Sequence, residues 1–444
     1  MKRVTPVKIF TLYWAFCLLL YAFGPFKWVT YKPVLFWSLN ILYYVFFCLG
    51  WVSAGKFSFG GYRTWTDRND RRLVKQLGFL VYVNLFYEII NIFRTFLFAS
   101  FDVGGLVNRI SSGISNMGDS YNSFQDNVNA TSAGVVGGSL ITLFNYVWDI
   151  WAFSTLIFSV MYFKKLKKHQ KIIAGITIVL EIIAYLARGT NIGIFRIIMI
   201  ILVIYYLKYM GGTGKKKKNT KDNKKNRIRI IVLGSLGVVI MVIIFFIIMK
   251  SRGGIAFWKQ NFYNIGGIHI NRDSVFFKII PSGFHQLLVS LSGYLSQGFY
   301  GMSLSLRLPW VPHWGIGGSM ALQNLLGNFI PTISERTYQV RIERFGCDSY
   351  TQWHTMYTWI ANDLSFFGVM LYMGLFGYVF RRALRDSIEL NNPYAKLMVY
   401  FMFLKAVFLP CNHQLAQTTY VMFSFIYVFI MWQISKRTSI RLTI

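Results

Sequence analysis

Long apolar segments separated by short polar connectors run through this chain of 444 residues. Ten of them are long enough, and poor enough in charged residues, to cross a bilayer as α-helices. Their apolar runs are continuous and do not alternate with polar residues, which indicates helices rather than strands. The predicted spans are 9–25, 33–54, 77–99, 137–163, 172–187, 192–207, 230–249, 364–380, 394–409 and 417–434.

Lysine and arginine gather in alternate connectors, as the positive-inside rule requires for cytoplasmic loops. The connectors 55–76, 164–171 and 208–229 are therefore inside, together with both termini. The pattern predicts an all-α polytopic membrane protein with one large extracytoplasmic loop between spans seven and eight. The predicted domains are an N-terminal bundle of seven spans (1–249), the loop (250–363) and a C-terminal bundle of three spans (364–444).

Composition supports a membrane protein, since 55% of the residues are hydrophobic and the mean hydropathy is +0.44. The net charge of +31 does not indicate nucleic-acid binding, because the basic residues lie in the short connectors, where they set orientation and attract anionic lipid. The expected partners therefore include membrane lipids and exclude nucleic acid.

Two parts of the outer surface are open to interpretation. Residues 284–306 and 316–330 are fairly apolar and are predicted to lie in, or dip into, the outer interface. The alternative is that both cross the membrane, which would make twelve spans. Residues 100–136 are rich in Gly, Ser and Asn and are expected to form a flexible outer loop.

Six ionisable residues fall within predicted spans. Such residues are costly in hydrocarbon, so they pair with one another or line a cavity. Charge pairing that fixes helix packing is one interpretation and a proton path is another, and the sequence does not group the residues into a relay. They are Glu88, Arg94, Asp149, Glu181, Arg196 and Lys405.

Candidate chemistry concentrates at the outer ends of the spans. Arg188 lies in a very short outer turn and Arg252 lies where the seventh span emerges. A guanidinium is permanently charged and can donate two hydrogen bonds to one phosphate, so both arginines are candidate phosphate ligands. The alternative for Arg188 is a side chain that only extends from the helix end to the membrane interface. His354 stands before the eighth span, where an imidazole can act as a general base, or pack as an interfacial side chain.

Three stretches resemble the bacterial oligosaccharide repeat-unit polymerases of the Wzy type and, more loosely, the O-antigen ligases that share their membrane fold. "ARGTNIG" is similar to the family's arginine turn between the fifth and sixth spans. "GYLSQGFYGMSLSLRLPWVPHWGIGGS" is similar to the aromatic, Gly-rich part of its large outer loop, and "WHTMYTWIANDLSFFGVMLYM" to its His-containing segment. In the ligases the histidine is commonly followed by Asn, whereas Thr355 follows His354 here.

The resemblance implies a GT-C-like bundle in the bacterial cytoplasmic (inner) membrane and inverting glycosyl transfer on its outer face. A chain on undecaprenyl diphosphate would be the donor and a lipid-linked repeat unit the acceptor, with no cofactor or metal and possible contact with a chain-length regulator. Arg188 and Arg252 would stabilise the diphosphate, and His354 would deprotonate the acceptor, with Asp363 or Glu343 as substitutes. Further substrate-binding candidates are Arg336, Arg341, Arg344, Tyr294 and Tyr300.

Two alternatives remain open. A ligase that passes finished glycan to another acceptor would use the same chemistry. A flippase or other transporter belongs to another class and should place polar residues through the bundle interior, often with internal repeats. The sequence shows no repeat of spans and gathers its polar residues in one outer segment, which favours the enzyme.

Overall fold

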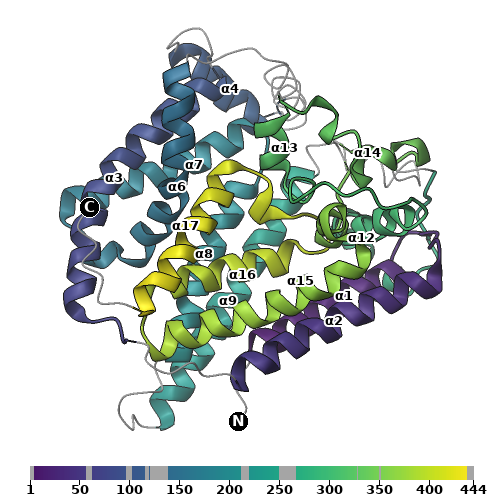
Figure 1. Ribbon diagram of the computed structural model, residues 1–444, viewed down its shortest axis with the longest axis horizontal. Coiled ribbons are helices and arrows are strands. Elements are labelled where there is room, and N and C mark those ends of the chain that lie inside the picture. The colour runs from purple at the N-terminus through teal and green to yellow at the C-terminus, as the bar shows by residue number, and fades with distance from the viewer. Residues whose placement is uncertain are drawn as a thin grey trace. The chain divides into compact units, whose positions relative to one another are not determined.

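The computed structural model describes residues 5–56, 63–96, 103–115, 120, 139–211, 220–249, 267–327, 329–349 and 352–437 (Figure 1). Within these residues the regular structure is helical, apart from one isolated β-bridge between Phe26 and Ile270. The chain divides into two compact units that are interleaved in sequence, and two of the boundaries between them fall within helices α15 and α16. The first unit is Met1–Ser58, Gly253–Arg382 and Met402–Thr418, and the second is Phe59–Arg252, Ala383–Phe401 and Thr419–Ile444.

A helix lies at each of the ten predicted spans. These helices are α1 (Pro6–Phe23), α2 (Pro33–Lys56), α3 (Asp67–Phe96), α6 (Ser139–Met161), α7 (Lys168–Ala187), α8 (Ile192–Gly211), α9 (Thr220–Met249), α15 (Met356–Glu389), α16 (Pro393–Phe408) and α17 (Thr419–Arg437). Six of them, within the described residues, are long and apolar enough to cross a membrane: α1, α2, α3, α6, α7 and α15. A helical membrane protein is therefore supported, while the count of ten and the orientation stay predictions.

In the first unit, α2 and α15 approach each other closely through glycine. A Cβ atom on Gly50 would lie 1.8 Å from the carbonyl oxygen of Gly374, and one on Gly377 would lie 2.0 Å from that of Phe47. Helix α1 joins them through aromatic contacts, since the Phe10 ring lies 4.3 Å from that of Phe47. Small residues let helix backbones pack closely where lipid provides no hydrophobic drive for association.

Helix α12 (His285–Ser305) is enclosed by the first unit over most of its length, from Leu288 onward. Gly298 of this helix packs directly against the backbone of Pro410, since a Cβ atom on Gly298 would lie 2.1 Å from the Pro410 carbonyl oxygen. Protein therefore covers the faces of residues 285–305, and their predicted place in or dipping into the outer interface stays a prediction. Helix α13 (Met320–Leu326) has seven residues and, at roughly 10 Å, is too short to cross a membrane.

Helix α15 begins at Met356, before the span predicted from 364, and its helical geometry breaks at Ser365 (φ 61°, ψ 166°). A positive φ is strained for a residue with a side chain. The break separates the start of α15, which carries Asn362 and Asp363, from the long apolar part. The shorter elements of this unit are α11 (Val275–Ile279) and α14 (Tyr338–Arg341).

In the second unit, α3 packs along α6 and α7, and α17 packs along α6. The loop predicted at 100–136 is wrong for residues 103–115, which form helix α4 (Val103–Ser115). Its Gly113 lies against the end of α7, where a Cβ atom would meet the Cα atom of Ala187 at 2.5 Å. The other residues of that predicted loop, except 120, lie outside the described part.

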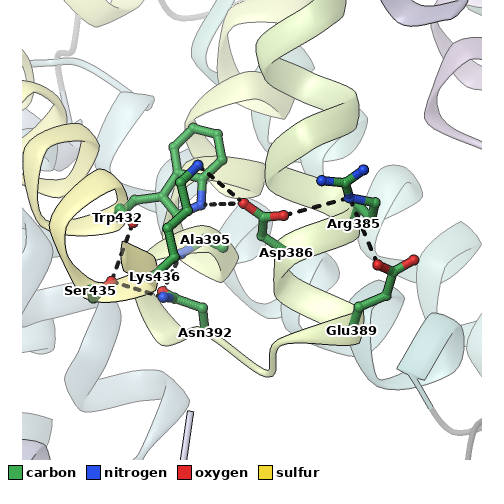
Figure 2. A network of polar contacts seen from close by, with 8 residues as sticks. All are labelled: Arg385, Asp386, Glu389, Asn392, Ala395, Trp432, Ser435 and Lys436. Atoms are coloured by element: carbon green, nitrogen blue, oxygen red, sulfur yellow. Dashed lines mark hydrogen bonds and ion pairs between the residues drawn. The ribbon is translucent and has the colours of Figure 1, made fainter. Parts of the chain in front are cut away.

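A polar network ties the end of α15 to α16 and α17 (Figure 2). The carboxylate of Asp386 accepts hydrogen bonds from Trp432 Nε1 at 3.0 Å and from Lys436 Nζ at 3.4 Å. Asn392 caps α16 by accepting from the amide of Ala395, and its amide donates to Ser435 Oγ at 2.8 Å. Asp386 and Lys436 are 1% and 3% exposed, and Arg385 forms a second ion pair with Asp386 at 3.7 Å, so two cations compensate the buried carboxylate.

Candidate functional site

The second unit encloses a group of ionisable side chains that we call the buried carboxylate cluster. Glu88 of α3, Asp149 of α6 and Glu181 of α7 are 2%, 4% and 2% exposed. Arg196 of α8 lies in the same unit and is 1% exposed. The structure thus gathers four of the six charged residues that the sequence left ungrouped.

Asp149 is fully hydrogen bonded as a carboxylate. The Tyr87 hydroxyl donates to Oδ1 at 2.7 Å, and the Thr419 hydroxyl donates to Oδ2 at 2.5 Å. Two neutral donors from α3 and α17 therefore satisfy both of its oxygens without a proton on the carboxyl group.

Glu88 and Glu181 are arranged differently. The Tyr420 hydroxyl donates to Oε2 of Glu181 at 3.0 Å. Oε1 of Glu181 and Oε1 of Glu88 are both buried, and neither accepts a hydrogen bond from the described residues. The two carboxyl groups lie within hydrogen-bonding reach of each other, and the charges of Arg188 and Asp149 act on Glu88.

Two arginines share one aromatic ring at the edge of this cluster. Arg188 caps α7 in the turn before α8, and its guanidinium carbon lies 5.2 Å from the ring centroid of Tyr185. Arg196 donates from Nη1 to the Tyr185 hydroxyl at 2.6 Å and lies over the Phe153 ring at 5.4 Å. Arg188 is half-buried, so its position permits contact with a ligand as well as with the cluster.

The other predicted site residues within the described part belong to the first unit, and Arg252 lies outside the described residues. His354 is 2% exposed, and a Cβ atom on Gly301 of α12 would lie 3.0 Å from its Nδ1. Neither ring nitrogen has a hydrogen-bond partner in the part of the chain that the structure describes. Burial lowers the pKa of His354 to about 4, against a smaller raising effect of Asp348.

Asp363 organises a glycine-rich loop. Its Oδ1 accepts from the amides of Gly315 at 2.8 Å and Gly317 at 3.0 Å, and its Oδ2 accepts from the amide of Gly318 at 2.6 Å. Both oxygens are thus used in shaping the loop. These contacts support a positioning role for Asp363, and its role as a substitute base stays a prediction.

Asn362 continues the same arrangement. Its Oδ1 accepts from the amide of Tyr338 at 2.8 Å, and its Nδ2 donates to the carbonyl oxygen of Gly317 and to Gln339 Oε1, both at 2.9 Å. Its own carbonyl oxygen accepts from Trp310 Nε1 at 3.1 Å. The sequence analysis missed Asn362, although it directly precedes Asp363.

His413 links this loop to α15 and α16. Its Nδ1 donates to the carbonyl oxygen of Gly318 at 2.7 Å, so its Nε2 is left to accept from the Tyr372 hydroxyl at 3.4 Å. Lys405 of α16 is 8% exposed, and its ammonium lies 4.1 Å from the Tyr372 ring centroid. Lys405 therefore belongs to the first unit, whereas the buried carboxylate cluster belongs to the second.

Three arginines between α12 and α15 lie over aromatic rings, namely Arg307, Arg341 and Arg344. Arg307 lies 4.1 Å from the Phe345 ring and 4.5 Å from the Tyr31 ring, and Arg344 lies 4.9 Å from the same Phe345 ring. Arg341 donates to the carbonyl oxygen of Pro309 at 3.0 Å, and Arg336 is exposed. The structure therefore joins Arg344 to Arg307, a residue that the sequence analysis did not select.

The two candidate tyrosines differ in exposure. Tyr300 is 3% exposed and stacks on Trp28 with ring centroids 5.2 Å apart. Tyr294 is half-buried and lies 5.0 Å from the Trp353 ring. Of the two, Tyr294 is the better placed for a sugar, because Tyr300 is already covered by protein.

The first unit also contains an apolar cleft of about 300 Å³. It is bounded by α1, α12 and the segment between α11 and α12, and its lining is almost wholly apolar. Its lining includes Phe16, Leu20, Ile280, Phe284, Leu287 and Leu291.

No family model, no curated protein and no solved structure matches this chain. Among the described residues, no group of three or more His, Cys, Asp or Glu side chains could hold a metal ion. The resemblance described above therefore rests on the short quoted stretches of sequence alone, and the activity is a matter for proposal.

Proposed function

We propose that this protein joins lipid-linked oligosaccharide repeat units into a surface polysaccharide on the outer face of the bacterial cytoplasmic membrane. The donor would be a growing chain on undecaprenyl diphosphate, and the acceptor a single lipid-linked repeat. The bond from the donor sugar to its diphosphate breaks as the acceptor hydroxyl forms the new glycosidic bond. The diphosphate leaves, and the hydroxyl proton passes to a base.

The observation that carries the proposal is Arg188 in the turn between α7 and α8. The turn is only four residues long, because α7 ends at Ala187 and α8 begins at Ile192. A half-buried guanidinium at the end of a membrane helix is suited to the charge that develops on a lipid diphosphate. Arg196 would add a second, fixed positive charge behind it.

The first unit supplies features that fit the lipid and the sugars. The apolar cleft along α12 has the chemistry to take part of a polyprenyl chain. The exposed or half-buried arginines on Phe345 and Tyr338 would meet the diphosphate or acidic sugars, and Tyr294 would stack on a sugar ring. His354 would accept the proton once substrate or water reaches its ring.

A ligase of the same fold would use the same groups and differ only in its acceptor. Transport of a lipid-linked oligosaccharide is a second candidate, and one observation favours it. The buried carboxylate cluster places Glu88, Asp149 and Glu181 inside a helical unit, where transporters carry their coupling groups.

The deciding experiment uses purified protein in liposomes with a synthetic undecaprenyl-diphosphate-linked repeat. We expect a ladder of elongated products from the wild-type protein. Arg188→Lys keeps the charge but loses the planar fork, and we expect it and Arg188→Ala to lower the rate by about 10²-fold. Arg72→Ala, which removes an exposed arginine of α3, is the matched control and should leave the rate unchanged.

Other results would redirect the proposal. A normal ladder from Arg188→Ala would move the phosphate role to Arg336, Arg341 or Arg344. Translocation of the labelled repeat across the bilayer without any elongation would favour transport. Transfer of a preformed glycan to a different acceptor, again without a ladder, would favour the ligase.

A further inference from the structure

Two carboxyl groups meet inside the second unit without enough donors between them. Glu88 and Glu181 are each 2% exposed and lie within hydrogen-bonding reach of each other. Two carboxylates in contact repel strongly where water is excluded, because the effective dielectric constant is low. The arrangement is unfavourable if both groups are ionised.

A single proton removes this problem. Oε1 of each residue lacks a hydrogen-bond donor among the described residues, and a protonated carboxyl group would itself supply an O–H donor. The neighbouring Asp149 needs no such proton, because Tyr87 and Thr419 donate to its two oxygens. Asp149 therefore has donors for both of its carboxylate oxygens, whereas Glu88 and Glu181 do not within the described part of the chain, although all three residues lie in the same cluster.

Charge balance also favours one proton on the pair. With it, the three carboxyl groups of the cluster carry two negative charges, which match Arg188 and Arg196, the two arginines that the described part of the chain places there. Among the described residues, the charged and titratable groups around the pair come from α3, α6, α7, α8, α16, α17 and the turn after α7, and they are Tyr87, Asp149, Tyr185, Arg188, Arg196, Tyr400 and Tyr420.

We propose that Glu88 and Glu181 share one exchangeable proton and form a proton-binding site within the helical bundle. An anion that draws Arg188 toward itself would remove positive charge from the pair and strengthen its hold on the proton. Proton binding would strengthen anion binding at Arg188 by the same factor, because coupling between two sites is reciprocal. The site does not depend on which reaction the protein performs.

Infrared spectroscopy of the reconstituted protein tests the site directly. At neutral pH we expect a C=O band of a protonated carboxyl group that shifts in D₂O and moves when glutamate, but not aspartate, is labelled with ¹³C. Glu88→Gln and Glu181→Gln should each abolish the band, because the introduced amide supplies the missing donor. Glu389→Gln, which changes an exposed glutamate outside the cluster, is the matched control and should retain it.

The labelling experiment needs only wild-type protein, so the proposal stays testable if a variant does not fold. Absence of the band from wild-type protein would overturn the shared proton. A band that moves with labelled aspartate, or that survives in the Glu88→Gln/Glu181→Gln double variant, would assign the proton elsewhere. None of these measurements depends on polysaccharide synthesis. The shared proton and the proposed function can therefore be refuted independently of each other.

Discussion

The His354 imidazole is buried between α12 and the start of α15, and burial lowers its pKa to about 4. At neutral pH the ring is therefore uncharged and carries a free lone pair. A general base needs that lone pair, but it also needs contact with the acceptor hydroxyl. Gly301 of α12 packs directly against the ring, since a Cβ atom there would lie 3.0 Å from Nδ1. The acceptor hydroxyl or a water molecule must therefore enter this packed region before His354 can act as a base.

His354→Gln should change how stability depends on pH. The folded protein holds His354 with a pKa of about 4, whereas an unfolded chain binds that proton near pH 6.5. Because the unfolded chain binds this proton more tightly, the free energy of unfolding falls as the pH drops from 6.5 toward 4, by on the order of 3 kcal/mol. Above pH 6.5 His354 causes no such loss. We expect the variant to lose this part of the acid sensitivity when unfolding temperature is measured from pH 4 to pH 8.

The exposed His169 provides the control, and His169→Gln should keep the wild-type pH dependence. Activity separates packing from chemistry in the same variant. If His354 is the base, His354→Gln should lower the rate of elongation by about 10²–10⁴-fold at a pH where the protein is stable. An active variant with an unchanged pH profile would contradict the base assignment.

At the scale of the helices, glycines set how closely α2 and α15 pack. The contact leaves no room for a β-carbon, because one on Gly50 would lie 1.8 Å from a backbone oxygen. Backbone cannot move aside as a flexible side chain can. The helices would have to separate, which would loosen the packing of the aromatic residues between them.

Gly50→Ala should therefore destabilise the protein, by about 1–3 kcal/mol as expected for overpacking. Gly175 of α7 is the matched helical control, because a β-carbon added there would meet nothing within 4 Å. Gly175→Ala should be neutral or stabilising, since alanine has the higher helix propensity. Thermal unfolding of both variants in the same detergent tests the difference, and equal unfolding temperatures would contradict the tight contact.

At the scale of the whole molecule, two units are built from interleaved segments of one chain. The predicted division into 1–249, 250–363 and 364–444 follows the order of the sequence. The first unit combines α1 and α2 with most of the segment predicted as the outer loop and most of α15, while α3 to α9 belong to the second. An N-terminal bundle cut after residue 249 would therefore contain parts of both units.

Topology remains the broadest prediction. The basic connector at 164–171 should be cytoplasmic, and the loop that follows α9 should be outside. Reporter fusions after Lys168 and after Gly254 should therefore report opposite sides of the membrane, and a fusion after Lys75 should agree with the first. The same side for Lys168 and Gly254 would refute the orientation.

The sequence by itself determined where the apolar helices lie and where several of them end. Spans predicted at 172–187 and from 192 correspond to α7, which ends at Ala187, and α8, which begins at Ile192. Helix length, apolar runs and turn residues are local properties, so neighbouring residues are enough to reveal them. Helix α4 was missed because its glycines and serines have the composition of a loop.

Only the tertiary structure decided which helices are neighbours, and with them the chemistry of the buried residues. Glu88 and Glu181 are on α3 and α7, and nothing local in either segment indicates that their carboxyl groups meet. Asp363 shapes the loop at Gly315 to Gly318 through contacts 45 to 48 residues apart in sequence. Helix α12 reads as interfacial because its composition is intermediate, yet its environment is set by the elements that enclose it.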